Sequence, residues 1–182
     1  MEVMVSIFVL SVGITAVLFL MVKNIKSSID SRNSIIASEL AQEGVELIRN
    51  IRDNNMANAE EDVFESLSYP LNPMIFKIDY NPNSISGGSI SWFSNSNPGK
   101  LYYNNSGYYS NSGGVETRFA RIIKIEKVGV DEDMLKVSSY VTWDGATDRD
   151  RWVKIARDAS VPCTIANKCV YAEDILTDWG SQ

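Results

Sequence analysis

The chain has 182 residues, enough for one domain with its own core, and carries a net charge of −6 with a sequence pI near 4.7. This acidic balance argues against general nucleic-acid binding, which needs Lys and Arg to neutralise phosphate. The sequence has no histidine, GxSxG motif or glycine-rich phosphate loop, which argues against an enzyme and gives no sign of a cofactor.

The first element is an uncharged apolar run between Val3 and Val22. About twenty such residues cross a hydrocarbon core of roughly 30 Å as a helix. A cleaved secretory signal is the alternative. However, the acid Glu2 precedes the run in place of a basic segment, and no small-residue cleavage site follows it. We therefore expect residues 3–22 to form a transmembrane helix.

Small or polar residues interrupt this run at Ser6, Ser11, Gly13 and Thr15, and in lipid such residues commonly mark close contact between helices. Glu2 has two interpretations. It either lies unpaired in the headgroup region or pairs with a positive partner, because an ionisable group at the edge of an apolar span is costly without one.

Beyond the run, the pattern becomes amphipathic. Apolar residues recur at a three-and-four spacing that predicts one stripe on a helix, at Ile25, Ile29, Ile36, Leu40, Leu47 and Ile51. The helix is expected to end near residues 53–55, giving a length on the order of 75 Å. A helix this long cannot be covered by its own small head alone, so lipid or similar helices must cover the rest.

Residues 1–14, MEVMVSIFVLSVGI, resemble the N-terminal segment of type IV pilins and type II secretion pseudopilins. In that family a basic leader is removed after a glycine, and the mature chain begins Phe-Thr-Leu, then an aliphatic residue and a glutamate. Met1 matches the aliphatic position and Glu2 the glutamate, so the leader and first three mature residues are expected to lie upstream. Residues 37–52, ASELAQEGVELIRNIR, are similar to minor pilins of the PilV and GspI-like kind. Phe19 stands where many major pilins have proline, which favours a minor subunit.

The basic residues Lys23, Lys26 and Arg32 follow the run and by themselves would place the head in the cytoplasm. A basic leader would remove this conflict. The resemblance implies a single-pass protein of the bacterial inner membrane with an extracytoplasmic head. It also implies three partners: a prepilin peptidase, an inner-membrane assembly platform and other pilin or pseudopilin subunits in a cell-surface or periplasmic filament. In the filament Glu2 would pair with the N-terminal amine of a neighbouring subunit.

The head is expected to comprise residues 56–182. Residues 80–114 are rich in Asn, Ser, Gly and Tyr and contain three glycine turn signals. This composition fits either an exposed hairpin-rich insertion whose aromatic residues cover the sheet or an adaptable binding surface. The aromatic residues are Trp92, Phe93, Tyr102, Tyr103, Tyr108 and Tyr109.

Alternation of apolar and polar residues predicts antiparallel strands within about 117–158, over residues 119–125, 135–143 and 151–157. The helix stripe is the nearest cover for their apolar face. The predicted fold is therefore α+β, with a long N-terminal helix (residues 1–55) packed on a small antiparallel sheet, as in pilins.

Two further groups of residues are candidate sites. Cys163 and Cys169 are spaced for a small disulfide loop or for two separate thiols, and an oxidising compartment favours the disulfide. Asp144, Asp148 and Asp150 lie in a loop like those in which some pseudopilins bind calcium. They lack EF-hand spacing, and solvated turns are the simpler interpretation.

The sequence thus predicts a minor pilin or pseudopilin, a structural subunit of a type IV pilus or type II secretion-like filament. The alternative is an extracytoplasmic binding or adhesion protein held by a signal anchor, using residues 80–114 as its ligand surface.

Overall fold

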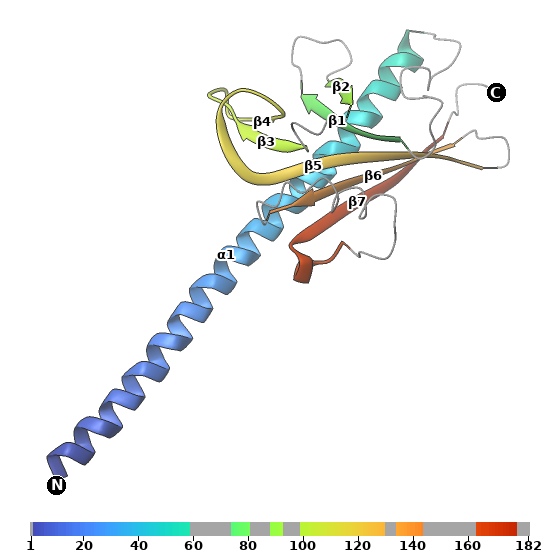
Figure 1. The fold of residues 1–182 in the computed structure, drawn as a ribbon. Helices are drawn as coiled ribbons and strands as arrows, with labels where there is room; N and C mark the ends of the chain where they lie inside the picture. Colours follow the sequence, from blue (N-terminus) through green and yellow to red (C-terminus); the bar gives the residue numbers. More distant parts are fainter. Residues whose placement is uncertain are drawn as a thin grey trace.

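The computed structural model describes residues 2–58, 74–80, 88–92, 99–129, 134–143 and 163–177. It is an α+β structure in which the long helix α1, Glu2–Ala57, packs by its upper half on an antiparallel sheet. The lower half of α1 projects away from the head as a free rod (Figure 1). With 56 residues, α1 is about 84 Å long. It ends two residues beyond the turn-favouring residues 53–55.

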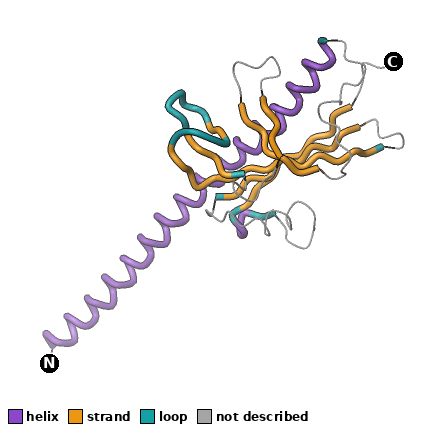
Figure 2. The backbone as a smooth tube through the Cα atoms, turned by 45° about the horizontal axis from the view of Figure 1, so that its top comes forward, coloured by secondary structure: helices purple, strands orange, loops and turns teal. Residues whose placement is uncertain are grey.

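The described residues form one seven-stranded sheet. Its strands are β1 (Met74–Tyr80), β2 (Gly88–Trp92), β3 (Lys100–Tyr103), β4 (Tyr109–Ser110), β5 (Val115–Val128), β6 (Met134–Thr142) and β7 (Cys169–Thr177). Every described pairing is antiparallel. Figure 2 shows the strands gathered beside the upper half of α1.

The 14-residue strand β5 organises the sheet because different halves of it pair with different neighbours. On one side it pairs with β6 from Ala120 to Val128. On the other side its first half pairs with β3, and residues 123–125 pair with β1. β7 continues the sheet beyond β6, and β2 beyond β1.

One face of the sheet is covered by α1, as the amphipathic pattern predicts. Leu40, Leu47 and Ile51 are buried, whereas Ile25 and Ile29 are 61% and 47% exposed, so only the upper part of the predicted stripe covers the head. The core continues into the sheet through the alternating residues Ile123, Ile125, Leu135, Val137 and Leu176.

The third strand beside β5 and β6 is β7, a strand that the sequence analysis did not predict. The predicted strand at 151–157, and residues 144–158 of the predicted range 117–158 as a whole, lie outside the described residues. The region 80–114 is also less loop-like than its composition indicates, because β2, β3 and β4 lie within it.

Candidate assembly surface

The lower part of α1 carries most of the exposed large apolar side chains among the described residues. Every residue from Glu2 to Ile29 is exposed, including Met4 at 80% and Phe19 at 69%. α1 has the length and composition to cross a membrane, and none of its most apolar window is buried. Soluble monomers rarely expose contiguous apolar patches larger than a few hundred Å², so this surface requires lipid or another protein around it.

Three hydroxyl groups within this surface form hydrogen bonds inside the helix. The hydroxyl of Ser6 donates to the carbonyl oxygen of Glu2 at 2.9 Å, that of Ser11 to Phe8 at 2.8 Å, and that of Thr15 to Ser11 at 2.7 Å. Because these hydroxyls need no outside partner, they can enter lipid or a helix interface at low cost.

Gly13 makes a shallow hollow in the same surface. A Cβ atom placed there would meet nothing within 4 Å, and Leu10, Ile14, Val17 and Leu18 line the hollow. A missing side chain on an exposed helix lets another backbone approach closely.

Glu2 lies in the first turn of α1, where a carboxylate interacts favourably with the unpaired N–H groups of the helix end. It is exposed, and within the described part of the chain it forms no ion pair. Glu2, the site residue predicted for assembly, is the first residue of α1, and this end of the helix projects away from the head (Figure 1).

The upper half of α1 lies against the sheet at Gly44 with no room for a side chain. A Cβ atom at this position would clash with the Ser139 hydroxyl and would lie 2.8 Å from Cδ1 of Ile123. The role of Gly44 could not be predicted from the sequence, because it depends on contacts with Ile123 and Ser139, about 80 and 95 residues later in the chain.

Arg121 is the main polar link between sheet and helix. Its side chain is 1% exposed, and Nη1 lies 3.1 Å from Oε1 of Glu43 and 3.0 Å from the carbonyl oxygen of Leu40. Nη2 donates to the carbonyl oxygen of Ile78 at 3.3 Å. A buried guanidinium is tolerated only when it is paired and hydrogen-bonded, and these contacts compensate both Nη atoms, whereas the buried Nε has no hydrogen-bond partner among the described residues.

A second link lies at the edge of the head, where Arg49 of α1 contacts Asp174 of β7 at 2.6 Å and Glu46 at 2.5 Å. The hydrogen bond to Asp174 raises the pKa of Arg49. Beside this link, an open cleft runs between α1 and β7, with Gln42, Glu43 and Glu46 on one wall and Tyr171 and Glu173 on the other.

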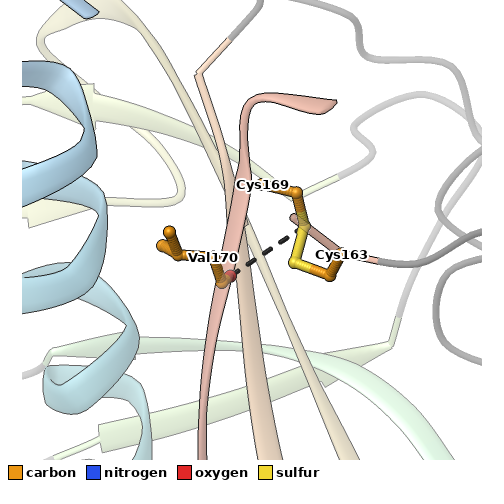
Figure 3. The surroundings of a disulfide bond; sticks show 3 residues. All are labelled: Cys163, Cys169 and Val170. Atoms are coloured by element: carbon orange, nitrogen blue, oxygen red, sulfur yellow. Dashed lines mark hydrogen bonds between the residues drawn. A yellow bond between two sulfur atoms is a disulfide. The ribbon is translucent and has the colours of Figure 1, made fainter. Parts of the chain in front are cut away.

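Cys163 and Cys169, six residues apart in the sequence, form a disulfide. The loop that it closes contains the 3₁₀ turn η1, Ile165–Asn167. Figure 3 shows Val170 pointing toward α1 and Cys169 pointing away, to the opposite face of the sheet. There the buried Cys169 packs with Ala120 and Ile122. Its Sγ lies 3.9 Å from the Val170 carbonyl oxygen.

The aromatic residues of region 80–114 are partly used for packing. Tyr109 makes edge-to-face contacts with Tyr103 and Phe119 at centroid distances of 5.3 and 6.0 Å. Burial against the core raises the pKa of Tyr109. Tyr103 is 46% exposed. Trp92 lies in β2, and Phe93 lies outside the described residues.

The calcium candidates Asp144, Asp148 and Asp150 also lie outside the described residues. Within the parts of the chain that the structure describes, no group of three or more Cys, Asp or Glu side chains is placed to hold a metal ion.

Comparison with known proteins adds no relative. No family model, no curated protein and no solved structure matches this chain.

Proposed function

We propose that this protein is a structural subunit, a minor pilin or pseudopilin, of a type IV pilus or type II secretion-like filament. One observation carries the proposal: a completely exposed apolar helix segment is rigidly continuous with a helix half that is fixed in a folded head. A simple membrane anchor needs the apolar segment alone. A rod joined to the head by a buried arginine and a tight glycine contact transmits the position of the head to the helix, as a filament subunit requires.

In this proposal the subunit waits in the bacterial inner membrane with its head outside the cytoplasm. A prepilin peptidase and an assembly platform then pass it into a filament. The apolar segment exchanges lipid for the helices of other subunits, and the outward heads form the filament surface. The self-satisfied hydroxyl groups support such an exchange, because they cost little in either surrounding.

In this proposal Glu2 carries a negative charge that meets an opposite charge only when subunits assemble. A carboxylate surrounded by apolar helices is costly unless an opposite charge compensates it, and the resemblance assigns that role to the N-terminal amine of a neighbouring subunit. The side chain has no ion-pair partner of its own among the described residues, which leaves it available.

The test compares Glu2→Ala with the unaltered chain in cells that assemble filaments. We expect equal amounts of both proteins in the membrane fraction, and only the unaltered chain in filaments sheared from the cells. Glu2→Asp should retain part of the incorporation because it keeps the charge. Normal incorporation of Glu2→Ala would contradict the charge-pair role. Absence of both proteins from every filament fraction would instead favour a signal-anchored binding protein.

A further inference from the structure

Two segments of α1 each carry three charged residues, and the order of their signs is opposite in the two segments. Below the head, Lys23, Lys26 and Asp30 follow one another with signs plus, plus, minus. Beside the sheet, Glu43, Glu46 and Arg49 follow one another with signs minus, minus, plus. The spacings are three and four residues in the lower triad and three and three in the upper triad, so the two patterns are complementary in order and nearly equal in length.

The two triads lie on opposite sides of the helix. Eighteen residues make five turns, so Lys23 stands directly below Ala41, and Lys26 directly below Gly44. Ala41 and Gly44 are buried on the sheet, and the lower triad therefore lies on the head side of the rod, beneath the head. Glu46, two residues after Gly44, points to the other side.

The upper triad is held in place and open to a partner. Glu43 is fixed by Arg121 at 3.1 Å, and Arg49 by Asp174 at 2.6 Å. The side chains of Glu43 and Arg49 are each 39% exposed, and that of Glu46 is 59% exposed. All three line the cleft between α1 and β7, which gives the rod of a partner a place to lie. The lower triad forms no ion pair within the described residues.

We propose that the occupant of this cleft is a second copy of the chain, parallel to the first and displaced along α1 by about 30 Å, or roughly 20 residues. This inference rests on the proposed function, because copies in a filament run parallel. At this offset Lys23 meets Glu43, Lys26 meets Glu46 and Asp30 meets Arg49. The side of one α1 that faces its own head lies against the opposite side of the next α1. All heads therefore project on the same side of the stacked copies.

Shorter offsets are less favourable. A displacement of 16 residues pairs Lys23 with Glu39 but sets Asp30 against Glu46. A displacement of 13 residues pairs Lys26 with Glu39 but sets Asp30 against Glu43. Only the longer displacement sets each charge of the lower triad against an opposite charge, whereas both of these shorter displacements set Asp30 against a glutamate.

Cysteine cross-linking of the full chain in its membranes and filaments tests this register. The chain has two cysteines, both in the disulfide, so introduced cysteines are its only free thiols. Val22→Cys with Gln42→Cys places exposed thiols 20 residues apart, on the head side and the opposite side respectively. The matched control pairs Val22→Cys with Ile35→Cys, which is also exposed and on the same side as Gln42 but at an offset of 13 residues.

We expect oxidation to join copies through positions 22 and 42 in much higher yield than through 22 and 35. Lys26→Glu should lower the 22–42 yield by about threefold or more, the size expected from a surface ion pair turned into a repulsion. Adding Glu46→Lys to the same chain should restore the yield.

Equal cross-linking at both offsets, or a yield indifferent to Lys26→Glu, would overturn the register. Filaments that contain the chain but lack the 22–42 cross-link would overturn the register and leave the proposed function standing. Absence of the chain from filaments would overturn both.

Discussion

Arg121, in the middle of β5, donates from Nη1 to the carbonyl oxygen of Leu40 in α1 at 3.0 Å. This bond ties a strand to a main-chain atom of a helix 81 residues away. Because the acceptor belongs to the backbone, the bond fixes the position along the axis of α1 at which the helix crosses the sheet. This position does not depend on the side chains around the bond.

Arg121→Ala should therefore destabilise the head by about 3 kcal/mol, since it leaves a cavity, removes one donor from each of two carbonyl oxygens and leaves Glu43 without its partner. The measurement is thermal or urea unfolding of the full chain in detergent. Arg118→Ala, on the same strand but exposed, is the control and should change stability by no more than about 0.5 kcal/mol. Equal effects of the two variants would show that the Arg121 link contributes nothing.

Gly44→Ala should destabilise the head by about 1–3 kcal/mol, because the added methyl group has no room between Ser139 and Ile123. Gly13→Ala provides the matched control in the same helix. With open space around it, Gly13→Ala should leave head stability unchanged or raise helix stability slightly. Unfolding of both variants followed by circular dichroism tests this contrast, and a harmless Gly44→Ala would refute the close contact.

Reduction of the Cys163–Cys169 disulfide should cost about 2 kcal/mol, the value expected for closing a six-residue loop in the unfolded chain. The loss should appear as a lower unfolding midpoint in the presence of reductant. A variant with both cysteines changed to Ala should show the lower midpoint with or without reductant. If reductant shifts the midpoint of that variant as well, the effect does not come from this disulfide.

Burial raises the pKa values of Tyr109 and Tyr140. A group whose folded pKa exceeds its unfolded value, which for tyrosine is about 10, loses its contribution to stability as pH rises through the folded value. The head should thus become less stable above about pH 10. Tyr109→Phe and Tyr140→Phe should each weaken that dependence, measured by unfolding at a series of alkaline pH values. An unchanged slope in the double variant would contradict this assignment.

The helix and its exposed half were predictable because an uncharged run and a three-and-four spacing are strong local signals. The cover of the sheet by Leu40, Leu47 and Ile51 followed from the same spacing. β7 was not predicted, because Glu173 and Asp174 interrupt its apolar alternation. The strands β2 to β4 were not predicted, because the segments between them are rich in Asn, Ser and Gly, which are typical of loops.

The roles of Arg121 and Gly44 could not be predicted from one sequence. Arg121 occupies an inward position of an alternating strand, where an arginine looks like an interruption of the pattern. Its meaning depends on Glu43 and Leu40, which lie about 80 residues earlier. Gly44 gave no turn signal, because it lies in the middle of a regular helix and is required by the approach of Ser139 and Ile123.

The most direct test of the account is electron microscopy of surface or periplasmic filaments with gold-labelled antibody against an epitope attached at the C-terminus of this chain. The account predicts label on filaments of cells that express the unaltered chain, and label restricted to membranes in cells that express Glu2→Ala. Label confined to membranes in both cases, in cells whose filaments are otherwise intact, would contradict the claim that α1 is an assembly element.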